Sequence, residues 1–232
     1  MRRFSEELFE ILDTARDGIA GVSAQIVDHA SFPNVVPEWL GMLFHVIRAT
    51  TPVLNKAVLR AEEHGLIDPF GHALRDFYKL KLKEETGHDL MLCKDLELIG
   101  VSRVNLEREM PPAGVVAMVG SQYYLIDYCH PGAYLGYLAL LEGYPMAAEQ
   151  LERLIERSGI PAKAWSTYRM HAQVDVHHRR ELEEVLDKVR EDDTQLRNLV
   201  IANGLRSAEY LCQSLEGILD NLNRETPRAG NV

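Results

Sequence analysis

Near its N-terminus, at residues 4–29, the chain carries the stretch FSEELFEILDTARDGIAGVSAQIVDH. Its apolar side chains recur every three or four residues, the spacing that keeps them on one face of an α-helix. The apolar stripe consists of Phe4, Leu8, Ile11, Leu12, Ala15, Ile19, Val22 and Ile26. The pattern predicts a long amphipathic helix that ends before Pro33 and Pro37.

The same spacing continues along most of the chain, between a few clusters of proline and glycine. It predicts helices over 38–64 (disrupted at Pro52), 69–99, 113–144 (split near Pro131), 161–189 and 192–222, and a short helix ending near Gly159. The charged segment 101–112 is predicted to be a surface connection. We therefore expect an all-α protein with one domain over residues 1–222 and a frayed tail over 223–232.

Composition excludes several classes of protein. With 46% hydrophobic residues, the 232-residue chain is long enough to bury one substantial core, which argues against disorder. A net charge of −10 repels phosphate backbones and anionic membrane surfaces, so neither nucleic acid nor a membrane is an expected partner. Three unpaired cysteines, and the lack of a signal-length apolar run, predict a cytoplasmic location.

The predicted helix after Pro161 carries His171, Asp175 and His178. At about 100° per residue, Asp175 lies roughly 40° from His171 on one side, and His178 lies about 20° from it on the other. The three side chains therefore share one helical face. A mixed imidazole and carboxylate set suits iron or manganese, whereas the alternative interpretation is a solvated polar face.

A second candidate fragment is Glu85-Thr86-Gly87-His88. On a helix, residues three apart project side by side, and a Glu-x-x-His pair is typical of carboxylate-bridged diiron sites in helical bundles. Glu84 stands four residues before His88 and remains the rival carboxylate.

A third fragment, LALLEGY at residues 138–144, places Glu142 in an otherwise apolar helix. An ionised carboxylate buried without a partner is destabilised by several kcal/mol, so a cation or a metal must accompany it. The alternative is a salt bridge to an arginine. Asp127 also follows apolar residues, so it too requires either a cation or a salt bridge. Tyr123, Tyr124 and Tyr134 are candidates to line a pocket.

Together these fragments supply three carboxylates and three imidazoles from three predicted helices. The predicted metal ligands are Glu85, His88, Glu142, His171, Asp175 and His178. This set is about what two iron ions require in addition to water and substrate, so a two-metal site is the simplest interpretation.

On these residues the sequence resembles the heme-oxygenase-like diiron oxidase and oxygenase superfamily, which includes proteins of the Chlamydia death-domain-associating type and TenA-like and PQQ-synthase-C-like relatives. The spacing His171-x-x-x-Asp175-x-x-His178 matches the third ligand helix of that family, and Glu142 takes the place of its middle glutamate. Glu85-x-x-His88 matches the first ligand helix in its short-spaced form. Some members instead place the first glutamate seven residues before the histidine, where this chain has Lys81.

The resemblance implies a bundle of about seven helices that binds two Fe ions (Fe²⁺/Fe³⁺) without porphyrin, with manganese or a single occupied position as alternatives. It implies a non-heme enzyme that activates O₂ to oxidise a small organic substrate, with Asp175 and Glu142 as candidates to bridge or chelate the metals. A homodimer is also implied. The resemblance names no catalytic residue, substrate or electron donor.

Two alternatives remain open on sequence. One is a TenA-like hydrolase or a PQQ-synthase-C-like cofactorless oxidase on the same fold, for which Cys129 is the candidate nucleophile. The other is a non-enzymatic helical interaction protein, in which the polar clusters are solvated faces. Bound metal distinguishes the iron enzyme from both.

Overall fold

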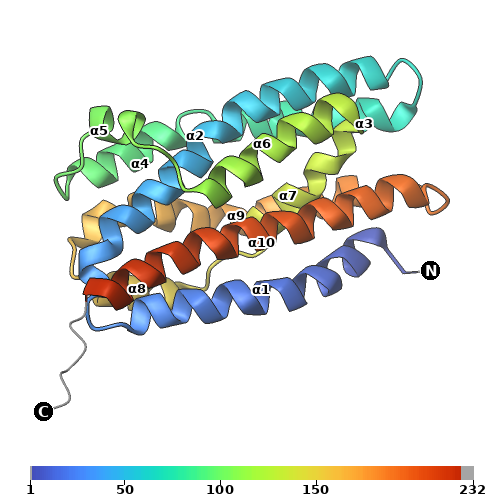
Figure 1. Cartoon of the computed structure of the whole chain (residues 1–232). Coiled ribbons are helices and arrows are strands. Elements are labelled where there is room, and N and C mark those ends of the chain that lie inside the picture. The colour runs from blue at the N-terminus through green and yellow to red at the C-terminus, as the bar shows by residue number, and fades with distance from the viewer. Residues whose placement is uncertain (1, 226–232) are drawn as a thin grey trace, which may run out of the picture.

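The structure, a computed structural model, describes residues 2–225, and all regular secondary structure within them is helical, as predicted. In chain order the helices are α1 (Phe4–Asp28), α2 (Phe32–His64), α3 (Pro69–Glu85), α4 (His88–Glu97), α5 (Arg103–Arg108), α6 (Ala113–Tyr128), the 3₁₀ turn η1 (Pro131–Ala133), α7 (Tyr134–Leu141), α8 (Ala148–Ser158), the 3₁₀ turn η2 (Ala162–Trp165), α9 (Ser166–Leu186) and α10 (Thr194–Glu225). The long helices α1, α2 and α10 run along the length of the bundle (Figure 1).

Helix α7 forms the centre of the bundle. Every residue from Tyr134 to Leu140 is buried, and the helix packs against α6, α9 and α10. A Cβ atom at Gly136 would collide with the carbonyl group of Val200 in α10, so only glycine permits this close approach. The break predicted near Pro131 is present, and it separates α7 from α6.

Helix α6 is largely apolar in sequence, but part of its apolar surface is exposed. Val116, Tyr124 and Tyr128 are more than half exposed on its outer face. A Cβ atom at Gly120 would meet no neighbouring atom, so this glycine does not mark a close helix contact. The apolar character of α6 therefore serves the core on one side only.

Pro33 and Pro37 lie within α2, whereas the sequence analysis placed the start of this helix after them. Helix α2 begins at Phe32 and continues through both Pro37 and Pro52, although residue 38 was the predicted start. Pro33 lies in the first turn, where its missing amide leaves no helical bond unmade. At Pro37 and Pro52, burial of the apolar face of α2 outweighs the lost hydrogen bonds.

The single helix predicted over 69–99 is interrupted. Helix α3 ends at Glu85, and α4 begins at His88. Between them, Gly87 adopts the left-handed conformation with φ +96°, which residues with a side chain rarely occupy. Glu85 and His88 therefore lie on two helices and not on one continuous helical face.

The predicted surface connection 101–112 contains the short helix α5. The hydroxyl of Ser102 caps it by accepting a hydrogen bond from the amide of Asn105, and buried Leu106 anchors it to the core. At the other end of the chain, α10 continues to Glu225, and the rest of the predicted tail lies outside the described residues.

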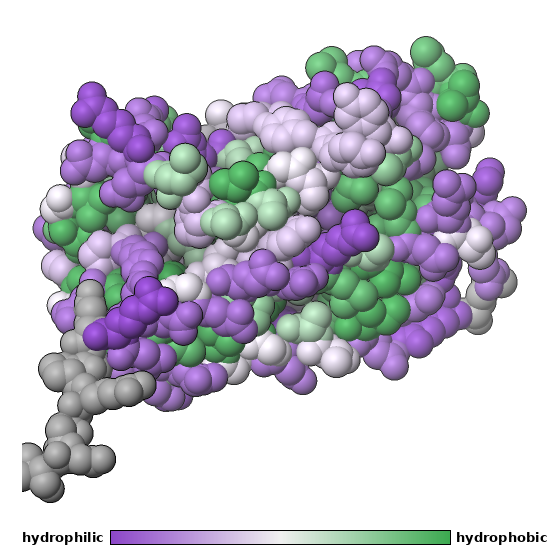
Figure 2. All heavy atoms as spheres, viewed as in Figure 1, coloured by the Kyte–Doolittle hydropathy of each residue, from purple (hydrophilic) through white to green (hydrophobic). Residues whose placement is uncertain are grey.

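The face of the molecule drawn in Figure 2 is largely polar, with hydrophobic residues in separate patches. One patch lies at the turn from α2 to α3, where Leu66 and Ile67 are 84% and 81% exposed. Among the described residues, no helix combines the length and the apolar character needed to cross a membrane.

Candidate metal centre

The six residues predicted as metal ligands meet in the interior of the bundle. Helix α3, helix α4, the C-terminal end of α7 and helix α9 supply them. They are Glu85, His88, Glu142, His171, Asp175 and His178. Two groups of three ligand atoms lie close enough together to hold an ion: Glu85, His88 and His171; and Glu85, Glu142 and His178.

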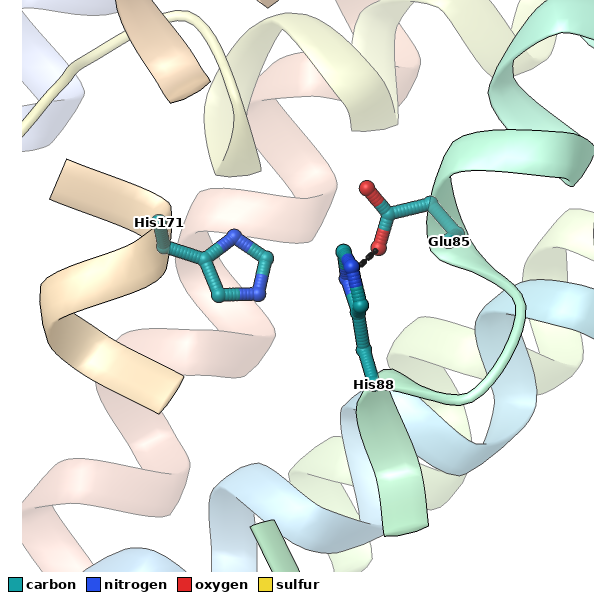
Figure 3. A group of neighbouring side chains, drawn as sticks. All are labelled: Glu85, His88 and His171. Carbon is teal, nitrogen blue, oxygen red and sulfur yellow. Dashed lines mark hydrogen bonds and ion pairs between the residues drawn. The ribbon is translucent and has the colours of Figure 1, made fainter. Parts of the chain in front are cut away.

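The first group lies at the break between α3 and α4. Nδ1 of His88 lies 2.8 Å from Oε2 of Glu85, across the turn at Gly87. The ring of His171 faces this pair from α9, with its centroid 5.0 Å from that of His88 (Figure 3). Two imidazoles and one carboxylate thus converge from three separate helices.

The second group lies beside the first and is more deeply buried. Nδ1 of His178 lies 3.5 Å from Oε2 of Glu142, and the Glu85 carboxylate completes the set. Glu85 therefore belongs to both groups, whereas the resemblance implied Asp175 and Glu142 as candidates to bridge or chelate the metals. A carboxylate between two neighbouring ion positions is placed to bridge them.

Asp175 lies between the two histidines of its own helix. Its Oδ1 atom is 3.5 Å from Nδ1 of His171 and 3.5 Å from Nδ1 of His178. It belongs to neither of the two three-residue groups. That Asp175 is itself a ligand therefore stays a prediction, and its position also suits a carboxylate that orients both imidazoles.

Several ligand atoms in the centre are buried without a hydrogen-bond partner. They are Oε1 of Glu85, Nε2 of His171, Oδ1 of Asp175 and Nδ1 of His178. Buried polar atoms are nearly always paired, so four unpaired atoms in one place indicate a missing partner. A transition-metal ion with mixed nitrogen and oxygen ligands fits this donor set.

Burial and neighbouring charges shift the pKa values of the centre toward the charged form for His171 and Glu85 but toward the neutral form for Glu142. Burial alone would lower the pKa of His171, but Asp175, Glu85 and Glu142 outweigh it and raise the pKa. Burial would raise the pKa of Glu85, yet the surrounding imidazoles lower it. For Glu142, burial and the nearby Glu85 raise the pKa to about 7 despite Lys81. A metal ion would relieve this unfavourable burial of a carboxylate.

Glu84, the rival of Glu85, points elsewhere. Its Oε2 accepts a hydrogen bond from Nζ of Lys81 at 2.9 Å and lies 3.4 Å from Nε2 of His178. The opposite ring atom of His178 faces Glu142. Glu84 is thus placed to fix the orientation of the imidazole and not to join either ligand group.

One positioning residue escaped the sequence analysis. Asp95 in α4 is buried, and its carboxylate accepts hydrogen bonds from the hydroxyl of Ser166 and from the amide and hydroxyl of Thr167. These two residues form the first turn of α9. Asp95 therefore connects α9, which carries three predicted ligands, to α4, which begins with His88. In sequence it is one acidic residue among many, with no distinguishing signal.

A cavity of about 220 Å³ adjoins the ligand cluster. Its wall consists of Leu43, Val46, Ile47, Thr50, Glu85, Tyr137, Leu138, Leu141, Glu142, Tyr144, Met146, Thr167, Tyr168, His171, Ala172 and Asp175. Most of these side chains are apolar, and the acidic ligands and His171 occupy one part of the wall. The lining tyrosines are not the predicted Tyr123, Tyr124 and Tyr134.

The other polar candidates have ordinary partners. Asp127 forms ion pairs with Lys56 at 3.0 Å and Arg60 at 3.5 Å. This agrees with the alternative interpretation, in which such a carboxylate forms a salt bridge to an arginine. Cys129 is exposed and does not line the cavity. His177 is also largely exposed, and its ring pairs with Glu181.

Comparison with solved structures defines the fold class. A TenA homolog from Pseudomonas syringae pv. tomato str. DC3000 superposes with a TM-score of 0.70 at 14% identity, over 90% of this chain and 92% of that one. A domain of unknown function with a heme oxygenase-like fold, from Shewanella denitrificans OS217, superposes with a TM-score of 0.71 at 14% identity, over 98% and 96%. The chain therefore has the heme oxygenase-like fold, as predicted.

Comparison with protein families is more specific. The family described as iron-containing redox enzymes matches residues 37–211, a segment that includes all six predicted ligands. The chain belongs to this family of iron-containing redox enzymes. No curated protein matches the sequence.

Proposed function

We propose that the protein is a non-heme diiron oxidase or oxygenase that activates O₂ to oxidise a small organic substrate. The observation that supports this proposal is the pair of adjacent ligand groups that share Glu85 beside a largely apolar cavity. In this proposal Glu85, His88 and His171 hold one iron ion, and Glu85, Glu142 and His178 hold the other. Bound iron supplies the electrons and the open coordination position that reaction with O₂ requires.

The carboxylates of the centre perform two tasks in this proposal. They hold the cations with oxygen ligands, and their negative charge offsets the positive charge of divalent ions in a buried place. Glu85 is 5% exposed, so water competes little for its oxygens. The unpaired atoms Oε1 of Glu85 and Nε2 of His171 are available for coordination.

The cavity supports a small and mostly apolar substrate. Its aliphatic wall, to which α2 contributes Leu43, Val46 and Ile47, excludes water and binds hydrocarbon surface. The residues that line the wall include no lysine or arginine, so His171 is the lining side chain that can carry a positive charge.

Tyr168 lines this cavity, and a hydrogen bond fixes the position of its hydroxyl. Nε1 of Trp39 donates a hydrogen bond to the Tyr168 hydroxyl at 2.6 Å. Burial raises the pKa of Tyr168 to about 12, although the Trp39 hydrogen bond opposes the shift. The phenol therefore remains protonated near neutral pH and can donate its own proton to a polar group of the substrate.

Metal counting after anaerobic Fe(II) reconstitution tests the proposal. We expect about two iron ions per chain, followed by O₂ consumption and a transient visible absorption band when air is admitted. The His178→Ala variant is expected to retain fewer ions and to lose the band. His177→Ala, which changes an exposed histidine on the same helix, is the matched control and should behave as wild type. A reconstituted wild-type protein without iron above background overturns the assignment.

The hydrolase alternative receives less support from the geometry. A cysteine-dependent hydrolase needs an activated thiol at its substrate cavity. Cys93, Cys129 and Cys212 all lie outside the cavity wall. By contrast, Glu85, Glu142, His171 and Asp175 line that wall.

A further inference from the structure

Lys81 is a fully buried lysine next to the metal centre. It lies in α3, one helical turn before Glu85, and its side chain is 0% exposed. Its Nζ atom lies 2.9 Å from Oε2 of Glu84, 2.9 Å from Oε2 of Glu181 and 3.6 Å from Oε2 of Glu142. These three carboxylates come from α3, α9 and the end of α7. The ammonium thus sits among oxygen atoms from three parts of the fold.

Such a position demands a positive charge. Burial of an ammonium is unfavourable by several kcal/mol unless anions surround it. Burial alone would lower the pKa of Lys81, but Glu142, Glu181 and Glu84 outweigh it and raise the pKa. The carboxylates need the cation equally, because Glu142 and Glu181 are themselves only 12% and 16% exposed.

The oxygen cage is chemically different from the two ligand groups beside it. Each of the two groups includes at least one imidazole nitrogen, whereas the three atoms that form ion pairs with Nζ of Lys81 are carboxylate oxygens. Two of these carboxylates also contact a histidine: Glu84 lies next to His178, and Glu181 lies next to His177. Oxygen-only sites prefer hard divalent ions such as Mg²⁺ and Mn²⁺.

We propose that the Lys81 ammonium is a built-in cation that fills a third cation site, formed by Glu84, Glu142 and Glu181, and thereby confines metal ions to the two imidazole-containing groups. Lys81 is a residue that determines metal specificity and stoichiometry in this proposal. The role holds whatever reaction the iron performs, so it goes beyond the proposed oxidase activity.

Removal of the ammonium exposes the site. In the Lys81→Ala variant three partly buried carboxylates face a space that no side chain fills, and their mutual repulsion favours any cation that enters. A divalent ion with bound water can use the volume that the lysine side chain leaves. We therefore expect Lys81→Ala to gain an ion and not merely to lose stability.

Equilibrium dialysis of the full chain against Mn²⁺, with metal analysis of the protein, measures this gain. We expect Lys81→Ala to bind about one more Mn²⁺ per chain than the wild type binds. Lys79→Ala removes the same charge from an exposed position of α3 and should bind the wild-type number. A folded Lys81→Ala protein with an unchanged Mn²⁺ count overturns the proposal.

A second comparison, made in a protein that lacks His178, distinguishes an ion at the new site from fuller occupancy of the group formed by Glu85, Glu142 and His178. Lys81→Ala is combined with His178→Ala and compared with His178→Ala alone. Because the proposed site uses carboxylate oxygens, the additional Mn²⁺ should persist in this pair. If Lys81→Ala binds no additional Mn²⁺ once His178 is replaced, the proposal is overturned.

Folding provides an independent measurement. If Lys81→Ala is unstable without metal, Mn²⁺ must restore its thermal transition, and a protein that Mn²⁺ does not restore contradicts the proposal. The variant Lys81→Ala/Glu181→Gln keeps the wild-type net charge but leaves two carboxylates. It should fold without metal and show no additional Mn²⁺, and an additional ion there counts against the three-carboxylate site.

Discussion

Oδ2 of Asp95 accepts hydrogen bonds from both the amide and the hydroxyl of Thr167, at 2.8 and 2.7 Å. This contact joins α4, which begins with His88, to α9, which carries three further candidate ligands. We expect Asp95→Ala to lower the free energy of unfolding by about 2–3 kcal/mol, because it leaves buried donors unpaired. Urea denaturation of the metal-free protein measures the loss. Asp95→Asn keeps an acceptor oxygen and should lose less, and equal losses would show that hydrogen bonding at this position is not the cause.

Gly87 allows the chain to turn between Glu85 and His88. Its φ of +96° disfavours any residue with a side chain, so Gly87→Ala should destabilise the protein by about 1–2 kcal/mol. Iron affinity should fall as well, because His88 is displaced. The control is Gly18→Ala in the exposed part of α1, which should stabilise the protein by about 0.5–1 kcal/mol. If the backbone of Gly87 matters, thermal melts of the two variants shift in opposite directions, and iron titrations show weaker binding in Gly87→Ala alone.

The shared position of Glu85 predicts an uneven loss of iron among variants. Glu85→Gln removes a ligand from both groups and should lose about two ions per chain. His88→Ala and His178→Ala each affect one group and should lose about one. Glu84→Gln should retain both ions, since Glu84 pairs with Lys81. Iron analysis after anaerobic reconstitution decides among these numbers, and a larger loss for Glu84→Gln than for Glu85→Gln would reverse the assignment.

His130 lies outside the metal centre, and its burial predicts that acid lowers the stability of the folded protein. Burial, and then the nearby ring of His64, lower the pKa of His130 to about 4. The folded state therefore keeps His130 neutral while the unfolded chain binds a proton below its ordinary pKa of 6.5. Stability is lost as the pH falls from about 6.5 to 4, by up to about 3 kcal/mol.

His130→Asn tests this sign. Asparagine keeps an acceptor for the amide of Gly132, which His130 binds through Nδ1 at 2.9 Å, but it has no proton to gain. Denaturant unfolding between pH 7 and pH 4 should show a smaller loss of stability in His130→Asn than in wild type. Parallel pH curves for the two proteins would contradict the lowered pKa.

Local sequence patterns determined the helical class and most of the candidate ligands. Apolar periodicity acts within one helix, so α1 could be located without tertiary information, and an almost wholly apolar segment with a break near Pro131 indicated the buried α7. The spacing of His171, Asp175 and His178 likewise needs only the geometry of a single helix. The imidazole and carboxylate types of these side chains were enough to suggest iron.

Tertiary structure alone decided how those residues are used. The sequence could not choose between Glu84 and Glu85, because on an unbroken helix the residues three and four before His88 can both reach its face. In the structure Glu84 pairs with Lys81, whereas Glu85 contacts His88 across the left-handed turn at Gly87. Likewise, Glu181, a partner of Lys81, and Thr167, a partner of Asp95, lie in another helix. Distances between helices depend on how side chains interlock across their contacts, and a one-dimensional pattern does not contain that information.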